Sequence, residues 1–496
     1  MDQTAYSTVQ AMDPFIKRFG SYNPKTHKHF FTATQLSLLN SLPRITFAAG
    51  ILLGGVLGER FGRRPIIFLM LTICLIGVTI SYCAQNYAQV LVGRMLVQGY
   101  IGMEGYLVPM FQAEIAPAAV RGVVVISYLF NHVFGSFIMS CITYRTSQLQ
   151  NDYCWKIPIA VMFVIPAFVI LCGWILPESP RWLLRRGRDE EALKQLRYLY
   201  GSNPLYTPEV ELALMKETLS MEVEKGSWLD LVRRTNLRRT GIVVIIQCLN
   251  QLTGQAFATQ YGTVFIKTLG TINPYKFTLI SNAIGVLGPF LTFFLVDRIG
   301  RRRMYLIFGS FCCAALITMG GLGLGTVTFQ QKAGIVSMTI LYPFFYCFSF
   351  GGMAPLTGAE VPALRLRDKS AVIGWTFQNL AAFVVTFTVP YLIDASYANL
   401  QSKLGFIYGA IGVLGLIWAY FSFPELMGRS LEEIDEMFVA KLPARKFRNY
   451  KPFIESAGNK VMEEHSANAG DSGIADLEGE MGKSSTVHVE NTKNYS

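Results

Sequence analysis

Apolar residues fall in long uninterrupted runs rather than in the short periodic stripes of a soluble chain. A bilayer core about 30 Å thick needs about 20 apolar residues per helix. Helices are expected, because each spanning segment must satisfy its own backbone hydrogen bonds and runs of this length are not barrel strands. The pattern predicts an all-α, polytopic membrane protein with eleven visible spans, at 37–58, 66–84, 89–110, 123–142, 157–176, 241–265, 278–296, 304–325, 333–356, 371–393 and 404–423.

Charge agrees with this interpretation. Of the 496 residues 51% are hydrophobic and only 16% are charged, and the formal net charge is +11. A basic chain can bind nucleic acid, but here the cations gather in alternate loops, at 59–65, 181–240 and 297–303. This alternation is typical of the positive-inside bias. We therefore expect no nucleic-acid partner, and a multi-pass protein of the plasma membrane whose basic loops and C-terminus are cytoplasmic.

Polar segments divide the chain into five expected parts. These are a partial first helix and extracellular loop (1–36), an N-terminal bundle (37–176), a cytoplasmic helical linker (177–240), a C-terminal bundle (241–423), and a C-terminal helix with a tail (424–496). The linker has helical periodicity at 189–200 and 209–225. The composition from about 440 onward predicts disorder. Most of the nine cysteines lie inside spans without metal-ligand spacing, so we expect neither a metal nor a cofactor.

An internal repeat is the strongest organisational signal. The segment 59–64 (ERFGRR) matches 297–302 (DRIGRR) position by position, and Pro-Glu occurs at both 177–178 and 424–425. A glutamate also precedes an arginine by seven residues in each half, at 114 and 121 and at 360 and 367. The offsets between the copies are nearly constant along the chain. Two homologous halves around a central site are a transporter architecture.

The repeated charges lie at the cytoplasmic ends of the spans. Taken alone, such a loop is ordinary stop-transfer charge, and one exposed ion pair contributes only about 0–1 kcal/mol. A network of pairs could clamp the halves together and bias a two-state equilibrium by a few kcal/mol. The expected gating residues are Glu59, Arg60, Arg63, Glu114, Arg121, Glu178, Arg181, Asp297, Arg298, Arg301, Glu360, Arg367, Glu425 and Arg429.

Several of these motifs carry a family resemblance. GERFGRR, Gly93-Arg94, PESPRW at 177–182, DRIGRRR and PELMGRSLEEID at 424–435 are similar to those of the sugar porter family of the major facilitator superfamily. The chain resembles the fungal branch with α-glucoside and hexose permeases, from Asp2 to about Asp435. The resemblance implies two bundles of six helices, an intracellular helical domain and rocker-switch transport of a sugar by a monomer.

The resemblance also implies a first span that ends in Gly-aromatic-Asp. Met1-Asp2-Gln3 stands where that motif is expected, so residues 4–19 would form the outer half of the first helix. We expect that the chain begins in mid-helix because of a truncated gene model or start-site error. The alternative is an inactive protein with eleven spans.

Polar residues inside apolar spans are candidates for sugar binding, because a buried polar group in a membrane is costly. Amides cluster around Gly254, which is expected to break its helix, and the bland alternative is polar contact between helices. The resemblance implies further positions, although Ala256 and Pro355 depart from the family pattern and leave a disaccharide, pentose, polyol or acid open. The substrate candidates are Ser136, Asn250, Gln251, Gln255, Gln260, Gln378 and Asn379.

Proton coupling needs a carboxylate whose proton affinity changes with access. The resemblance makes Asp2 and Arg94 the expected coupling pair, with Glu104 as an auxiliary or as a structural ion pair. A passive facilitator and a non-transporting nutrient sensor stay open, although the short tail argues against a sensor. No phosphate-binding loop or nucleophile–base arrangement indicates an ATP-driven pump or an enzyme. The expected partners are a small sugar, protons and the lipid bilayer.

Overall fold

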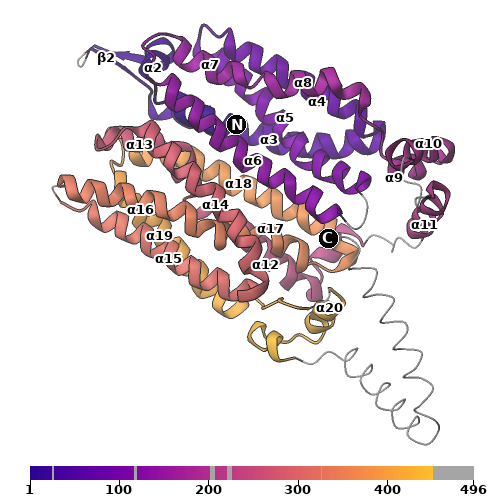
Figure 1. Cartoon of the computed structure of the whole chain (residues 1–496). Coiled ribbons are helices and arrows are strands. Elements are labelled where there is room, and N and C mark those ends of the chain that lie inside the picture. Colours follow the sequence, from indigo (N-terminus) through magenta and orange to yellow (C-terminus); the bar gives the residue numbers. More distant parts are fainter. Residues whose placement is uncertain are drawn as a thin grey trace, which may run out of the picture.

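The computed structural model describes residues 1–24, 27–116, 120–201, 207–220, 226–325, 327–429 and 431–450. Two groups of long helices lie side by side, and Figure 1 shows the N-terminal group above the C-terminal group. Short helices gather at the right-hand end, where α9, α10 and α11 lie, and near α20. The fold is that of an all-α polytopic membrane protein.

The N-terminal half contains eight helices and one small hairpin within the described residues. The hairpin pairs β1 and β2 antiparallel, with Ser21 opposite Phe30. The elements are α1 (Asp2–Val9), α2 (Asp13–Phe19), β1 (Ser21–Asn23), β2 (Lys28–Phe30), α3 (Ala33–Phe61), α4 (Arg63–Tyr82), α5 (Tyr87–Ile115), α6 (Arg121–Thr146), α7 (Tyr153–Val161) and α8 (Val164–Cys172).

The linker and the C-terminal half follow. The linker elements are η1 (Gly173–Ile175), α9 (Pro180–Arg185), α10 (Asp189–Tyr200), α11 (Pro208–Ser220) and η2 (Trp228–Leu231). The C-terminal elements are α12 (Arg234–Leu252), η3 (Phe257–Tyr261), α13 (Gly262–Leu269), α14 (Pro274–Ile299), α15 (Arg301–Leu322), α16 (Phe329–Phe348), α17 (Phe350–Glu360), η4 (Leu364–Leu366), α18 (Arg367–Ile393), η5 (Gln401–Lys403), α19 (Leu404–Ser422), α20 (Leu431–Val439) and η6 (Ala444–Asn449).

All eleven predicted spans fall on helices. Among the described residues, eight helical stretches are long and apolar enough to cross a membrane. The runs at 89–110, 123–142 and 278–296 coincide with α5, α6 and α14, which have 29, 26 and 26 residues. Three other runs contain breaks, between α7 and α8, between α16 and α17, and from α12 through η3 to α13.

Polar caps start the long helices where the apolar runs begin. Thr32 and Gln35 form a reciprocal capping box at the start of α3, and Asn86 and Gln89 do the same at α5. A Thr-x-x-Gln box likewise begins α16. Each box satisfies backbone N–H groups that the first helical turn leaves unpaired.

Small residues bring α3 and α5 into close contact. A Cβ added at Gly50 would lie 2.1 Å from the carbonyl oxygen of Gly99, and one at Gly54 would lie 3.1 Å from Cα of Met103. Gly58, one turn further along, faces Leu107 at 2.7 Å. Glycine at every fourth position lets two membrane helices approach backbone to backbone.

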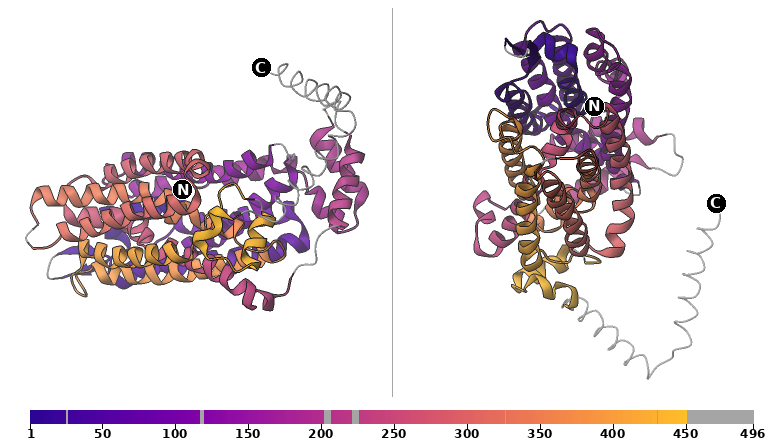
Figure 2. Two further views of the ribbon diagram at one scale, coloured as in Figure 1. Left: turned by 90° about the horizontal axis from the view of Figure 1, so that it is seen from below. Right: turned by 90° about the vertical axis from the view of Figure 1, so that its left-hand side faces the viewer.

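The apolar core is divided between the halves. One buried cluster lies in the C-terminal half and extends from Ile242 to Phe447, and two others lie in the N-terminal half. The halves meet where α3 packs against α18 and α6 against α14. The end-on view in Figure 2 (right) shows the N-terminal helices at the top and the C-terminal helices below them.

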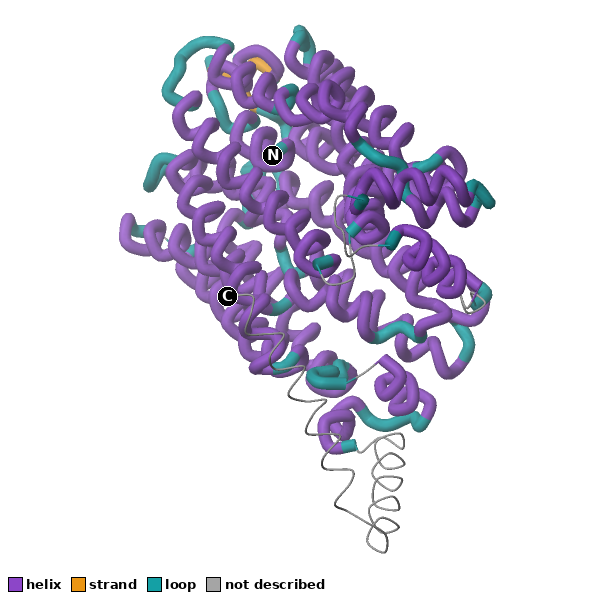
Figure 3. Tube along the Cα trace, turned by 45° about the vertical axis from the view of Figure 1, so that its right-hand side comes forward, coloured by secondary structure: helices purple, strands orange, loops and turns teal. Residues whose placement is uncertain are grey.

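Two sequence-based expectations need correction. Residues 4–19 are not one helix, because Met12 adopts an extended backbone (φ −77°, ψ 132°) between α1 and α2 and Pro14 begins the next helix. The disorder expected from about residue 440 does not begin there, because the short helix η6 follows α20. Its Phe447 packs against Phe438 of α20, with 5.1 Å between the ring centres. The rest of the expected tail, 451–496, lies outside the described residues, as do residues 221–225 of the expected linker helix. Figure 3, which marks helix, strand and loop, shows that helices make up most of the structure and that the small strands lie at one end.

Candidate transport site and mirrored charge clusters

A half-buried carboxylate, that of Glu178, caps α4 in the N-terminal half. Glu178 Oε1 accepts a hydrogen bond from the backbone N–H of Arg63 at 2.9 Å, and Glu178 Oε2 accepts one from Arg64 N–H at 3.2 Å. Gly62, with φ +100°, makes the turn between α3 and α4, and a Cβ there would lie 2.6 Å from Glu178 Oε2. The glycine is therefore needed for both its backbone conformation and the space that the carboxylate fills.

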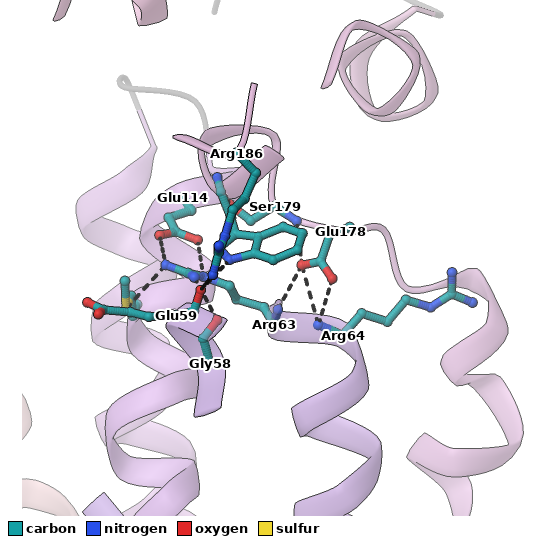
Figure 4. Close-up of polar contacts among 10 residues, drawn as sticks. Gly58, Glu59, Arg63, Arg64, Glu114, Glu178, Ser179 and Arg186 are labelled. Atoms are coloured by element: carbon teal, nitrogen blue, oxygen red, sulfur yellow. Dashed lines mark hydrogen bonds and ion pairs between the residues drawn. The ribbon is translucent and has the colours of Figure 1, made fainter. Parts of the chain in front are cut away.

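Arg63 connects three helices through its guanidinium group. Its Nε and Nη2 donate to the two carboxylate oxygens of Glu114 at 2.9 and 2.7 Å, and its Nη1 donates to the carbonyl of Gly58 at 2.9 Å. The Arg63 side chain is only 1% exposed and that of Glu114 9%. Figure 4 shows this two-pronged ion pair between α4 and α5 beside the carboxylate of Glu178. Such a buried fork is strong and geometrically specific.

The C-terminal half repeats this arrangement. Glu425 Oε1 accepts from the backbone N–H of Arg301 at 2.8 Å, and Gly300 makes the preceding turn with φ +93°. Arg301 Nη2 and Nε donate to Glu360 at 3.1 and 3.3 Å, and Nη1 donates to Asp297 at 2.8 Å. The sequence repeat is therefore a repeat of structure, with one capping carboxylate and one guanidinium fork in each half.

The remaining gating candidates have varied surroundings. The backbone carbonyl of Glu59 accepts a hydrogen bond from Trp182 Nε1 at 2.8 Å. Arg60 lies over the ring of Phe61, with 5.5 Å between the guanidinium carbon and the ring centre. Arg298 is exposed, Arg367 is half-buried, and Arg429 Nη2 donates to the carbonyl of Tyr450 at 2.6 Å. Arg181 lies on α9 and is half-buried, and the side chain of Arg121 lies outside the described residues.

These clusters pair helices within a half. The ion pairs Arg63–Glu114 and Arg301–Glu360 join neighbouring helices of the same bundle. The linker contacts each bundle at a different place. Arg186, directly after α9, donates to the carbonyls of Glu59 and Arg60 in the N-terminal half, both at 3.0 Å, and Lys369 on α18 donates to the carbonyl of Gly226 just before η2. A clamp made directly between the mirrored charges thus stays a prediction for another conformation.

A cluster of amides lies where α12 breaks. Gln251 Nε2 and Gln378 Nε2 both donate to Asn250 Oδ1, at 2.7 and 2.9 Å, and Asn250 Nδ2 donates to the carbonyl of Phe350 at 3.0 Å. The Asn250 and Gln251 side chains are buried, yet Gln251 Oε1 has no hydrogen-bond partner. A buried unpaired acceptor is costly, so it marks a place where a hydroxyl group or water can donate.

Gly254 breaks the helix as expected, with φ +90°, and the π-turn η3 follows. Gln255 and Gln260 lie beside this break, and the Oε1 of each is also buried without a partner. Asn379 is buried but its Nδ2 donates to the carbonyl of Trp375 in its own helix at 2.9 Å. Ser136 lies on α6, where its hydroxyl donates to the carbonyl of His132 at 3.2 Å. Of the seven substrate candidates, hydrogen bonds join Asn250, Gln251 and Gln378 directly.

The expected coupling pair is close but not in contact. Asp2 Oδ2 accepts from Gln98 Nε2 at 2.6 Å, and Asp2 Oδ1 is buried without a partner. Arg94 Nη1 instead donates to the carbonyl of Leu39 at 2.8 Å and to Asn40 Oδ1 at 2.9 Å. Glu104 lies one turn from Tyr100, its hydrogen-bonding neighbour. Arg94 is therefore bound to α3 here, and not to Asp2.

Sequence reasoning missed the polar residues that connect the halves on the side opposite the charge clusters. Gln10 Nε2 donates to the carbonyl of Gln260 at 2.7 Å, and Ser37 Oγ donates to the carbonyl of Phe387 at 2.7 Å. Lys267 Nζ donates to the carbonyl of Ala11 and to Asp13 Oδ1, both at 2.6 Å. The sequence could have indicated Gln10 and Ser37 as candidates, because each is an uncharged polar residue between apolar neighbours, Gln10 directly after α1 and Ser37 within α3.

The chain is similar to known membrane transport proteins. The family described as sugar (and other) transporter matches residues 1–438. A probable glucose transporter of Neurospora crassa is 29% identical over 419 residues, which are 82% of this chain and 70% of the relative. A high-affinity glucose transporter of Schizosaccharomyces pombe is 26% identical over 484 residues, covering 95% and 90%. An inward-open xylose transporter from E. coli has the same fold, with a TM-score of 0.71, 20% identity and coverage of 88% and 97%.

Proposed function

Because the chain belongs to the sugar (and other) transporter family, we propose that it carries a sugar across the plasma membrane by proton symport and alternating access. The amide cluster is the observation that carries this proposal. Asn250, Gln251 and Gln378 come from two helices and leave a buried carbonyl oxygen of Gln251 unpaired beside a broken helix. A sugar hydroxyl both donates and accepts, so it can satisfy such a group when it displaces water.

The substrate class follows from the chemistry of this cluster. Its side chains are neutral amides, which suit a neutral polyhydroxylated solute better than an acid, because an acid would need a cationic partner. Both fungal relatives are named for glucose and the structural neighbour for xylose. Hexoses and pentoses are therefore the first substrates to test.

Proton coupling is assigned to Asp2, Arg94 and Glu104. Asp2 has one carboxylate oxygen on Gln98 and the other without a partner, so it can exist protonated or can receive the guanidinium of Arg94. A carboxylate with these two alternatives changes its proton affinity with conformation, which is what symport requires. Glu104, which lies on α5 with Arg94, would adjust the local charge.

Alternating access is supported by the division of contacts between the two ends of the molecule. On the side of α2 and the hairpin, Lys267, Gln10 and Ser37 connect the halves directly. At the other end the mirrored guanidinium forks stay within their own halves. This arrangement corresponds to a state whose extracellular side is held closed.

The decisive experiment is uptake in a transporter-null host across hexoses, pentoses, α-glucosides, polyols and quinate. Proton symport predicts accumulation above the external concentration that a protonophore abolishes, together with sugar-induced alkalinisation of the medium. A passive facilitator would equilibrate the sugar and ignore the protonophore. A non-transporting sensor would bind sugar without uptake, and Gln251→Leu provides the site control in each assay.

A further inference from the structure

Four buried polar residues form a continuous hydrogen-bonded chain between the two halves. Arg94 Nη1 donates to Asn40 Oδ1 at 2.9 Å, Asn40 Nδ2 donates to Gln10 Oε1 at 3.1 Å, and Gln10 Nε2 donates to the carbonyl of Gln260 at 2.7 Å. Their exposed fractions are 2%, 2%, 1% and 1%. The chain runs from α5 through α3 and the end of α1 to η3, and we name it the inter-half relay.

Each end of the relay leaves polar atoms available. At the N-terminal end Arg94 Nε and Asp2 Oδ1 are buried without hydrogen-bond partners. At the C-terminal end Gln260 Oε1 is likewise buried and unpaired. The first end lies at the proposed proton site and the second beside the proposed sugar site. The relay therefore connects the two places where ligands of the transport cycle would bind.

We propose that Asn40 and Gln10 are positioning residues that couple the protonation of Asp2 to closure of the extracellular side at η3. This inference rests on the proposed function and deepens it. Arg94 has two alternative partners, because it can bind Asn40 and the Leu39 carbonyl, as here, or the ionised carboxylate of Asp2. Two sites are coupled when an element between them has two arrangements and both sites shift the equilibrium between these arrangements.

The direction of the coupling follows from charge. When Asp2 is ionised, its negative charge draws the Arg94 guanidinium away from Asn40, because opposite charges attract strongly in a buried setting. Asn40 then loses one of the groups that orient its amide and keeps only the Leu36 carbonyl in its own helix, which accepts from Nδ2 at 2.9 Å, so the contact from Gln10 to η3 weakens. When Asp2 is protonated, Arg94 returns to Asn40 and the relay holds α1 against η3. Proton binding from outside therefore favours extracellular closure.

Other charged groups surround this switch. Arg44 on α3 interacts electrostatically with Asp2. Glu104 and His132 lie on α5 and α6, the helices that contact α1. The Asp2→Asn variant identifies the switching group, because it mimics protonated Asp2 and leaves Arg44, Glu104 and His132 in place.

The geometry offers a matched pair of variants. Gln10→Met removes both links of the relay at its midpoint while keeping the length of the side chain and the partners of Arg94. Ser37→Ala removes another buried hydrogen bond between the halves, from the same helix that carries Asn40, without touching the relay. Gln10→Glu is a second variant that keeps the acceptor for Asn40 and loses the donor to Gln260.

The test has two readouts on the full chain in lipid nanodiscs and proteoliposomes. The first is hydrogen–deuterium exchange of peptides over η3 and α13 at acidic and alkaline pH, without sugar. Protection factors, which are corrected for the intrinsic pH dependence of amide exchange, are compared between the two pH values. They should fall at alkaline pH in the wild type and Ser37→Ala and stay high at both in Asp2→Asn, and in Gln10→Met and Gln10→Glu they should be at least about five-fold below the wild-type value at acidic pH. Wild-type protection factors that are the same at both pH values, or a pH dependence of protection retained in Gln10→Met, would overturn the relay.

The second readout is sugar transport. Gln10→Met should keep sugar counterflow, which needs no proton gradient, and lose protonophore-sensitive accumulation, whereas Ser37→Ala should keep both. Unchanged accumulation in Gln10→Met, or an equal loss in Ser37→Ala, contradicts the proposal. If the wild type shows no proton-driven uptake, the proposed symport fails, and the exchange experiment still decides whether Asp2 controls η3.

Discussion

Gly62 provides the sharpest test of how the mirrored charge clusters are built. Replacing it with alanine places a side chain at φ +100°, ψ 171°, a backbone region in which residues other than glycine cost about 1–3 kcal/mol. The new Cβ would lie 2.6 Å from Glu178 Oε2 and must displace a carboxylate that caps α4. Losing one charge-assisted hydrogen bond costs about 1.5–3 kcal/mol. The expected destabilisation of the N-terminal half is therefore about 2–6 kcal/mol.

The assay is thermal unfolding of the purified protein in detergent, followed by fluorescence-detected size exclusion. For a unit of about 150–250 residues, 1 kcal/mol shifts the midpoint by about 2–4 °C, so Gly62→Ala should lower it by roughly 10 °C. Gly187→Ala is the matched control, because Gly187 also has a positive φ, +72°, but a Cβ there would meet nothing within 4 Å. It should cost only backbone strain, about 1–2 kcal/mol. Equal losses in the two variants would refute the assigned role of Glu178.

Three further outcomes are expected. In the same thermal assay Arg63→Ala should destabilise the protein more than Arg301→Ala, because the Arg63 side chain is 1% exposed and that of Arg301 14%. Removing one partner of a buried ion pair costs about 3–5 kcal/mol. The reverse order would contradict this argument from burial. Gln251→Leu should weaken sugar binding in counterflow by about ten-fold or more, since one hydrogen bond in the site is lost. Asn379→Leu should have a smaller effect, because the Asn379 amide donates its hydrogen bond within its own helix. The hydrogen bond from Arg197 lowers the pKa of Glu209 in the linker, so this contact should stabilise α11 above the ordinary glutamate pKa and be lost as pH falls through the lowered value. Protection factors of the amides of 208–220, corrected for intrinsic exchange, should therefore fall at acidic pH in the wild type but not in Glu209→Gln.

The sequence by itself predicted the secondary structure of this protein well. Spans, loops and the linker helix at Asp189–Tyr200 are governed by local composition, because the bilayer demands long apolar helices whatever they pack against. Gly254 also ended its helix as expected, since only glycine tolerates that backbone conformation easily. The duplicated motif indicated two copies of one structure, and Glu178 and Glu425 do cap equivalent helices.

The partners of the buried charges could not be predicted in the same way. Arg94 was expected to pair with Asp2, but it binds Asn40 and the carbonyl of Leu39. The single expected helix at 4–19 is two helices for a local reason, because Met12 is extended and Pro14 lies in the first turn of the next helix. For Arg94, in contrast, the decisive groups lie far away in the chain, and the residue has several possible partners of similar chemistry.

Hydropathy and repetition therefore determined that this is a membrane protein of long helices with two related halves, because those properties depend on each segment and its solvent. Only the tertiary structure decided which polar groups meet. The link from Gln10 to Gln260 joins residues 250 positions apart, and its existence depends on two bundles that dock within hydrogen-bonding distance. A hydrogen bond requires its two atoms to lie about 3 Å apart, and no local pattern in the sequence specifies that distance.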